Sequence, residues 1–146
     1  MDFMEAALEQ ARIALYLKEV PIGAVIVKDD RIISAAFNLK ETTQDPTAHA
    51  EILAIRKACE ALNNWRLAGC DMYVTLEPCV MCASAIAQSR LSNLYIGAPN
   101  TDRGDCESVI NIIESDHINN TVKVHLAYND GCSEILTEFF RKRRKG

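Results

Sequence analysis

The sequence lacks the segments that direct a chain into or across a membrane. Residues 1–5 (MDFME) show no basic start followed by an apolar stretch, which is the pattern of a secretory signal peptide. No run of about 18 apolar residues, the length that a transmembrane helix needs, occurs in the chain. We therefore expect a cytoplasmic protein that does not act at a membrane.

The sequence also lacks an excess of positive charge. It has 16 lysines and arginines against 20 aspartates and glutamates, and its formal net charge is −4. This balance excludes a protein that binds nucleic acid through a positive field over its whole surface. Basic residues gather in one place, Arg141 to Lys145. Any contact with nucleic acid is therefore expected to be local.

Internal repeats, low-complexity tracts and glycine- or serine-rich linkers are missing as well, so nothing divides the chain. With 146 residues, 49% of them hydrophobic, the chain can bury the core of one ordinary domain without disulfide support. We expect a single domain over residues 1–146. Because the chain shows no export signal, its six cysteines are better explained as free thiols or metal ligands than as disulfides.

Helix and strand patterns alternate along the chain. Residues 22–27 and 32–37 are rich in β-branched and apolar residues, and they predict a hairpin buried on both faces. Pro46 suits the first turn of a helix that begins close to His49. The pattern as a whole predicts helices at 2–19, about 49–62, 77–88 and 129–144, a short helix near 107–114, and strands at 22–27, 32–37, 72–76, 94–96 and 122–126. These elements indicate an α/β fold with helices on both faces of a central sheet.

Two short motifs carry the chemistry that the sequence suggests. His49 and Glu51 lie at the expected start of one helix, and Cys79 and Cys82 follow Pro78 at the start of another. One imidazole and two thiolates form a soft ligand set that selects zinc, and three protein ligands leave one tetrahedral position open for water. Glu51 lies in the same turn as His49, close enough to act as a general acid and base without being a ligand.

Each motif alone has a plainer explanation. A Cys-x-x-Cys pair also occurs as a redox pair, as half of a structural metal site or as two buried thiols. A structural tetrahedral site would need a fourth protein ligand. None of the other cysteines and histidines has the close spacing of a second ligand pair: Cys59, Cys70, Cys106, Cys132, His117 and His125. The two motifs together therefore favour a catalytic metal site.

The combination of His-x-Glu with Pro-Cys-x-x-Cys resembles the signature of the zinc-dependent nucleobase deaminases. The strings at residues 45–51 (DPTAHAE) and 75–82 (TLEPCVMC) resemble those of the bacterial tRNA adenosine deaminases, and the similarity extends from the first helix to residues 139–141 (FFR). This resemblance implies the cytidine-deaminase-like fold, which is a three-layer α/β/α sandwich with a central mixed five-stranded sheet. It also implies a homodimer with one zinc ion per subunit.

The resemblance implies hydrolytic deamination of adenosine to inosine at the wobble position of an arginine tRNA anticodon. His49, Cys79 and Cys82 would hold zinc, which makes hydroxide available to attack C6 of adenine, and Glu51 would carry the protons. Because C6 is hidden in a base stack, the enzyme needs an unpaired base, and an anticodon loop presents one.

Residues that contact the target nucleoside are also implied by the resemblance. Asn38 matches an asparagine that hydrogen-bonds the nucleoside, although a turn residue is the plainer explanation. Val20 and Leu76 match walls of the base pocket, and both also suit a core. After residues 97–98 the relatives commonly have an Arg-Asp pair, whereas this chain has Pro99-Asn100. The Asn100 amide would meet a ribose hydroxyl differently from a carboxylate, so the choice between RNA and DNA is open at this position.

In most proteins, a basic run such as residues 141–145 is the solvated end of a helix. The resemblance implies that this tail, with Arg141 and Arg143, contacts the RNA backbone. Phe140 beside it either stacks on a base or anchors the helix to the core.

Two other functions are compatible with the same residues. One is a deaminase of a free base or nucleoside, such as guanine or cytosine, which would have no use for the basic residues 141–145. The other is a non-catalytic, zinc-stabilised RNA-binding module, in which Glu51 only caps a helix or pairs with a neighbour.

Overall fold

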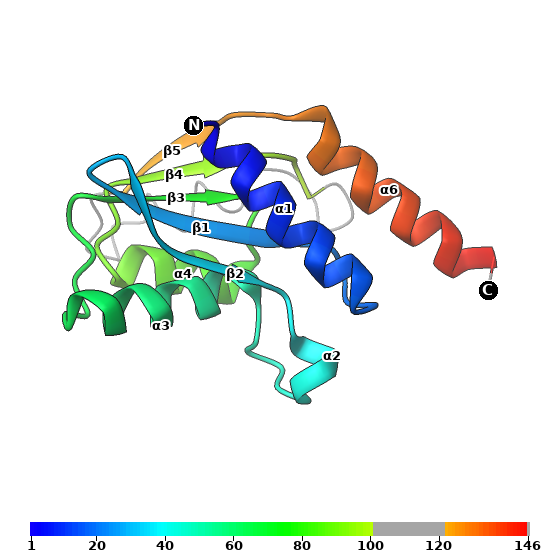
Figure 1. The fold of residues 1–146 in the computed structure, drawn as a ribbon, viewed down its shortest axis with the longest axis horizontal. Coiled ribbons are helices and arrows are strands. Elements are labelled where there is room, and N and C mark those ends of the chain that lie inside the picture. The colour runs from blue at the N-terminus through cyan, green and yellow to red at the C-terminus, as the bar shows by residue number, and fades with distance from the viewer. Residues whose placement is uncertain (101–121, 146) are drawn as a thin grey trace.

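The structure, a computed structural model, describes residues 1–100 and 122–145. Its described strands form one mixed sheet, and helices cover both faces of that sheet (Figure 1). None of the described helices is long and apolar enough to cross a membrane. The elements follow in the order α1 (Phe3–Tyr16), β1 (Gly23–Lys28), β2 (Arg31–Phe37), α2 (Lys40–Thr43), α3 (Ala50–Leu62), β3 (Cys70–Val74), α4 (Val80–Gln88), β4 (Asn93–Ile96), β5 (Lys123–Leu126) and α6 (Asp130–Lys145).

The sheet has the strand order β2-β1-β3-β4-β5. β1 pairs antiparallel with β2 and β3, whereas β3, β4 and β5 run parallel to one another. α1 packs on one face of the sheet with α6 beside it, and α3 and α4 pack on the opposite face (Figure 1). The expected three-layer α/β/α sandwich with a mixed five-stranded sheet is therefore confirmed.

Alternation along β1 supplies a hydrophobic core on each face of the sheet. Ala24 and Ile26 pack in the core beneath α3 and α4, whereas Val25 and Val27 pack in the core beneath α1 and α6. This division follows because successive side chains of a strand point to opposite faces. β1 is thus a central strand that is buried on both sides, as the sequence predicts.

The edge strand β2 is covered on both faces, but less completely than β1. Among the described strands it pairs only with β1, and Arg31 at its start is exposed. Its buried residues face α3, and the Ser34 hydroxyl donates a hydrogen bond to the Ala54 carbonyl oxygen at 2.9 Å. On the opposite face Ile32 and Ala35 are half-buried and pack against the core beneath α1 and α6, so the predicted hairpin is covered on both faces and differs in the exposed start of β2.

The segment before α3 is a turn and not the first turn of a helix. Asp45 Oδ1 accepts hydrogen bonds from the backbone N–H and the hydroxyl of Thr47, at 2.8 and 2.7 Å. α3 starts at Ala50 with His49 as its N-cap, so the expected start near His49 is confirmed while Pro46 lies outside the helix. An aspartate side chain that binds its own local backbone competes with helix formation in this way.

Other boundaries differ by a few residues. α1 ends at Tyr16, and α4 begins at Val80 because Cys79 is its N-cap. α2 was not predicted, since a helix of 4 residues is too short to display hydrophobic periodicity. The predicted helix near 107–114 lies outside the described residues.

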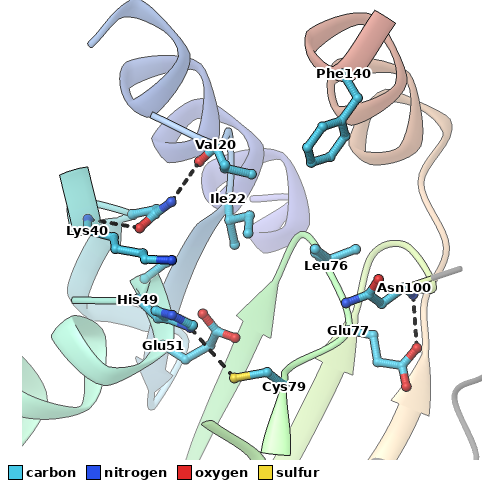
Figure 2. Close-up of a pocket in the computed structure, with 12 residues that line it drawn as sticks. Val20, Ile22, Lys40, His49, Glu51, Leu76, Glu77, Cys79, Asn100 and Phe140 are labelled. Atoms are coloured by element: carbon cyan, nitrogen blue, oxygen red, sulfur yellow. Dashed lines mark hydrogen bonds between the residues drawn. The ribbon is translucent and has the colours of Figure 1, made fainter. Parts of the chain in front are cut away.

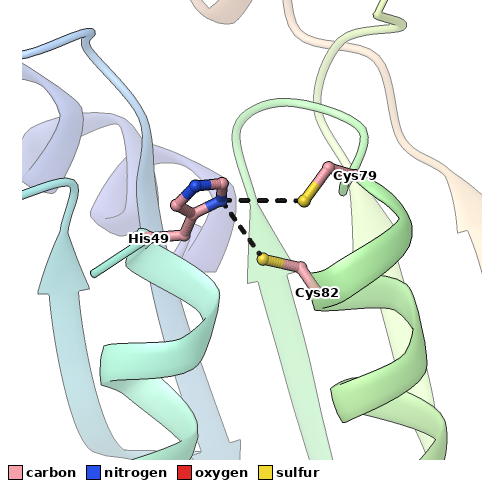
Figure 3. A group of neighbouring side chains, drawn as sticks. All are labelled: His49, Cys79 and Cys82. Carbon is pink, nitrogen blue, oxygen red and sulfur yellow. Dashed lines mark hydrogen bonds between the residues drawn. The ribbon is translucent and has the colours of Figure 1, made fainter. Parts of the chain in front are cut away.

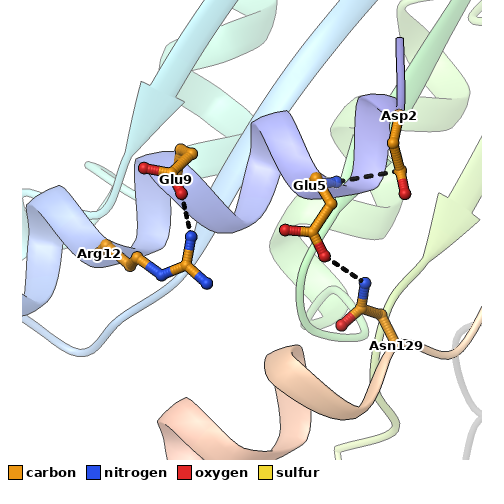
Figure 4. A network of polar contacts seen from close by, with 5 residues as sticks. All are labelled: Asp2, Glu5, Glu9, Arg12 and Asn129. Carbon is orange, nitrogen blue, oxygen red and sulfur yellow. Dashed lines mark hydrogen bonds and ion pairs between the residues drawn. The ribbon is translucent and has the colours of Figure 1, made fainter.

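The first turn of α1 contacts the residue that precedes α6 (Figure 4). Asp2 Oδ1 accepts hydrogen bonds from the backbone N–H groups of Met4 and Glu5, at 3.0 and 3.1 Å, and thereby caps the helix. The Glu5 carboxylate accepts a hydrogen bond from the side-chain amide of Asn129 at 3.0 Å. Because Asn129 immediately precedes α6, this contact helps to fix the start of α6 beside α1.

A glycine sets the distance between α1 and the sheet. A Cβ atom at Gly23 would lie 2.1 Å from the Ala7 carbonyl oxygen and 2.5 Å from the Ala11 backbone nitrogen. Both are backbone atoms of α1, so the whole helix would have to move to make room. The close approach of α1 to the first residue of β1 therefore depends on the missing side chain.

Gly23→Ala is expected to lower the free energy of unfolding by about 1–3 kcal/mol, the usual range for overpacking a dense interior. Urea unfolding followed by circular dichroism measures the change. Glu60→Ala on the exposed side of α3 is the control, and its effect should stay within about 0.5 kcal/mol. A Gly23→Ala protein as stable as the control would contradict this packing.

Candidate active site

The pairing register brings several loops to one end of the sheet. Gly23 pairs with Phe37, Ala24 pairs with Val74, and Val74 pairs with Ile96. The chain therefore enters β1 and leaves β2, β3 and β4 at the same end. In α/β proteins, ligands bind outside the carboxyl ends of parallel strands, here β3 and β4. The loops at this end are thus placed to build a site together.

Two helices begin at this end with a potential ligand as N-cap. His49 precedes α3 with φ −78° and ψ 151°, and Cys79 precedes α4 with φ −73° and ψ 176°. Neither side chain caps its own helix, so both are available to face each other. Cys82 lies in the first turn of α4, one turn on from Cys79. Because α3 and α4 pack on the same face of the sheet, their first turns meet.

His49, Cys79 and Cys82 form one cluster (Figure 3). The Nδ1 atom of His49 lies 3.7 Å from Cys79 Sγ and 3.5 Å from Cys82 Sγ, and the three ligand atoms lie within 4.8 Å of one another. A nitrogen and a sulfur bound to one tetrahedral zinc at the usual bond lengths are about 3.6 Å apart. The expected ligand residues are therefore brought together at separations that suit a metal ion.

The two thiols of the cluster differ in acidity. The hydrogen bond from Cys82 is the largest cause that lowers the pKa of Cys79, which falls to about 3, and the hydrogen bond with His49 also lowers it. The same pairing, together with burial, raises the pKa of Cys82. One thiolate is therefore present at neutral pH, and thiolate is the form that binds metal.

Glu51 lies beside this cluster in the first turn of α3 (Figure 2). The residue is only 4% exposed. Burial raises the pKa of its carboxyl group to about 7, against the opposing effects of its own backbone N–H and of His49. A carboxyl group with a pKa near the working pH can both accept and donate a proton, which general acid–base chemistry requires.

His49, Cys79 and Glu51 line a cavity of about 230 Å³ (Figure 2). Of the residues that the sequence predicted for substrate binding, five line this cavity: Val20, Asn38, Leu76, Asn100 and Phe140. Four further lining residues were not predicted, namely Ile22, Lys40, Ala50 and Glu77. Ile22 and Glu77 flank predicted positions in the same loops, and that adjacency was the signal that could have found them.

Asn38 combines its place in the pocket wall with a structural role. Its side-chain Nδ2 donates to the Val20 carbonyl oxygen at 3.3 Å, and its Oδ1 accepts from the Lys40 backbone N–H at 3.1 Å. The amide still has one N–H and one lone pair for a ligand. The turn role and the binding role are therefore compatible.

Glu77 holds the loop that carries Asn100. Its backbone N–H donates to the Ala98 carbonyl oxygen at 2.8 Å, and its Oε1 accepts from the Asn100 backbone N–H at 3.0 Å. Glu77 is only 3% exposed. This double contact fixes Asn100 at the edge of the pocket.

The two predicted arginines lie on different sides of α6. Arg141 lines a second hollow of about 460 Å³ with Arg144, and this hollow shares Leu76, Asn100 and Phe140 with the first cavity. Arg143 instead lines a hollow of about 400 Å³ between α6 and the end of α1, where its guanidinium lies 5.5 Å from the Phe139 ring centroid. The structure therefore places Arg141, and not Arg143, next to the active pocket.

A buried carboxylate supports the loop between β2 and α3. Glu19, which is 1% exposed, accepts hydrogen bonds from the backbone N–H groups of Glu41 and Thr42 at 3.1 and 2.6 Å. Burial alone would raise its pKa, but the bonds with Thr42 and Glu41 outweigh burial and leave the pKa lowered. Glu19 therefore anchors α2 beside the pocket.

Comparison with known proteins agrees with this geometry. The family model of the MafB19-like deaminases matches residues 1–144. The chain is 46% identical over 142 residues to a tRNA-specific adenosine deaminase of Aquifex aeolicus (strain VF5), with 97% of this chain and 94% of that protein covered. The chain belongs to the tRNA-specific adenosine deaminase family.

Solved structures of other deaminases resemble this deaminase. One comes from a study of A-to-I editing by tRNA:A34 deaminases at the wobble position of transfer RNA. It has a TM-score of 0.83 at 47% identity, covering 92% of this chain and 98% of that chain. A guanine deaminase of Bacillus subtilis has a TM-score of 0.66 at 34% identity, covering 97% and 92%. The chain is therefore an enzyme with the deaminase fold. Solved proteins with this fold are named for different substrates, tRNA and guanine.

Glu19→Gln should destabilise the deaminase by about 1 kcal/mol at neutral pH, because charge-assisted hydrogen bonds to the Glu41 and Thr42 N–H groups become weaker neutral ones. Because folding lowers the pKa of Glu19, its contribution is complete above the ordinary glutamate pKa of about 4.3 and disappears as the pH falls through the folded value. Urea unfolding of both proteins between neutral and acidic pH measures this difference. A stability difference that does not shrink in acid would contradict the charged cap.

Proposed function

We propose that this deaminase hydrolyses adenosine to inosine at the wobble position of a tRNA anticodon, that of an arginine tRNA. The observation that carries the proposal is a buried glutamate beside a three-ligand cluster, in a pocket that continues toward a basic helix end. The family supplies the reaction class. The names of the relatives and the basic end of α6 favour tRNA over a free base.

His49, Cys79 and Cys82 are the proposed ligands of one zinc ion per subunit. One imidazole and two thiol groups are the donors that zinc prefers, and their separations of 3.5 and 3.7 Å suit tetrahedral coordination. Zinc bound there makes a water nucleophile available near neutral pH. The three protein ligands leave room for that water.

Glu51 is the residue proposed to move protons. With a pKa of about 7, its carboxylate accepts a proton from the attacking water and delivers a proton to N1 of adenine. It then helps the amino group on C6 to leave as ammonia, and an oxo group takes its place. Water is the only co-reactant, so the reaction balances without an oxidant or a reductant.

The pocket suits one unstacked base. Val20, Ile22 and Leu76 give it apolar walls, and its volume of about 230 Å³ is below the range of about 300–1,000 Å³ for drug-sized ligands. The remaining N–H and lone pair of Asn38 can bind the nucleoside, and Asn100 is held at the pocket edge for a ribose contact. Such a pocket requires a base that is already unpaired, as in an anticodon loop.

The end of α6 is the proposed contact with the RNA backbone. Arg141 and Arg144 line the hollow next to the pocket, where their charges can bind phosphates. Phe140 lines both hollows, and we assign it a stacking contact with a base. Arg143 lies on the other side of the helix, so we assign it to a phosphate farther from the target base.

We also propose that residues 1–146 form a single zinc-dependent deaminase domain that works as a homodimer in the cytoplasm. The family match over residues 1–144 and the single sheet of the described residues support one domain. The homodimer and the cytoplasmic location rest on the family to which the chain belongs and on its tRNA substrate.

A second candidate is a deaminase of free guanine or another free base. The similarity to the guanine deaminase favours it, and the zinc cluster would serve both substrates. A free base carries no phosphates, so it would gain nothing from the basic end of α6. That difference separates the two candidates.

Glu51→Gln should abolish inosine formation from an arginine tRNA anticodon stem-loop while zinc stays bound. The amide cannot exchange protons, and losing a general acid and base lowers kcat by about 10²–10⁴-fold. Nucleoside mass analysis measures inosine, and metal analysis of the same sample measures zinc. Glu60→Gln, an exposed change on the same helix, should leave both values unchanged. A fully active Glu51→Gln enzyme would refute this assignment.

Arg141→Ala combined with Arg144→Ala should raise KM for the stem-loop. Losing two single-strand phosphate contacts lowers the slope of log affinity against log salt by about 1.4. Binding measured by fluorescence anisotropy at several salt concentrations tests this value. The control pair Arg12→Ala and Arg56→Ala removes the same charge from exposed sites outside the pocket. Equal slopes for both pairs, with efficient turnover of guanine, would favour the free-base enzyme.

A further inference from the structure

One positive charge in the active pocket has no role in the reaction described above. Of the described residues that line this pocket, Lys40 is the one lysine or arginine. The carboxyl groups that share the pocket belong to Glu51 and Glu77, and both are buried. Lys40 is itself exposed at the rim. A charge in this place is available to a ligand that extends beyond the pocket.

Hydrogen bonds hold the backbone of Lys40, whereas its side chain forms no ion pair with a described residue. Its backbone N–H donates to Asn38 Oδ1 at 3.1 Å, and the next two N–H groups of α2 bind Glu19. Among the residues that the structure describes, no carboxylate forms an ion pair with its ammonium group. The side chain is thus anchored at its base and can bind an anion without first breaking an ion pair.

The placement of Lys40 complements the cations of α6. Figure 2 shows Lys40 and Phe140 on opposite sides of the pocket. The apolar wall residues Val20, Ile22 and Leu76 lie between them. Beyond Phe140 lie Arg141 and Arg144, which line the adjoining hollow. Positive charges therefore flank the pocket on both sides.

A nucleoside inside an RNA strand carries a phosphodiester group on each side. Once its base enters the pocket, the two groups must leave the pocket mouth in different directions. We propose that Lys40 binds one of these two phosphodiester groups, on the side of the pocket away from α6. This inference rests on the proposed function, since a free base would carry no such group. Lys40 then binds the RNA strand and takes no part in the chemistry at the base.

The test compares Lys40→Ala and Lys40→Arg on an arginine tRNA anticodon stem-loop. Losing one charge-assisted contact should raise KM about tenfold with little change in kcat. It should also lower the salt slope by about 0.7. Lys40→Arg keeps the charge and should restore both values. Lys57→Ala is the matched control, because Lys57 is an exposed lysine of α3 outside the pocket.

A second arm removes the charge from the RNA. Two stem-loops each carry a neutral methylphosphonate at one of the phosphates that flank the wobble adenosine. One of them should raise the KM of the wild-type enzyme by the same factor as Lys40→Ala, and it should have no further effect on that variant. The other should weaken both enzymes equally, which identifies the phosphate that Lys40 binds.

The outcomes separate this inference from the proposed function. If the wild-type enzyme forms inosine but Lys40→Ala keeps the wild-type KM and salt slope, Lys40 does not bind phosphate and the inference is overturned. It is equally overturned if each methylphosphonate weakens the wild-type enzyme and Lys40→Ala by the same factor. If the zinc-loaded wild-type enzyme forms no inosine from the stem-loop, the proposed function fails, and the inference fails with it.

Discussion

The active end of this molecule depends on the meeting of two helix N-termini. α3 and α4 pack on one face of the sheet, and each begins with an extended N-cap residue whose side chain does not cap its own helix. His49 and Cys79 are 30 positions apart in the chain, yet this packing sets their ligand atoms 3.7 Å apart. Without it, the thiols would be two ordinary cysteines and the imidazole a surface group. The same junction brings the buried Glu51 beside the ligand cluster, at the wall of the pocket.

Charge is divided between the inside and the rim of the site. Burial holds the pKa of Glu51 near neutrality, which suits a group that accepts and releases protons in each cycle. The lysine and arginine side chains lie outside this buried centre, at Lys40 on one side and at Arg141 and Arg144 on the other. Under the proposed function, this division lets a chain with a net charge of −4 bind an anionic strand locally. In the proposed function the contacts with the strand lie at the pocket mouth, where the strand is held while one base enters the pocket.

Most helices and strands, and the cluster of His49, Cys79 and Cys82, could be predicted from hydrophobic periodicity and motif spacing, because both signals are local. Three features could not. Lys40 reaches the pocket through α2, which is held by Glu19 from a distant part of the chain. The exposed start and the partial burial of β2 depend on its place at the sheet edge. Arg141 and Arg143 look equivalent in a basic run, but successive helix residues turn by about 100°, so the side of α6 that packs inward decides which one faces the pocket.

The most direct test of the central claim is to incubate the zinc-loaded enzyme with unfractionated tRNA and sequence the products, because inosine is read as guanosine. Free adenine, guanine and cytosine are assayed in parallel with the same enzyme. The account predicts that adenosine changes to guanosine in the sequence at the wobble position of arginine tRNA and at no other adenosine, while the free bases are not consumed. Unchanged tRNA together with rapid loss of a free base would contradict it.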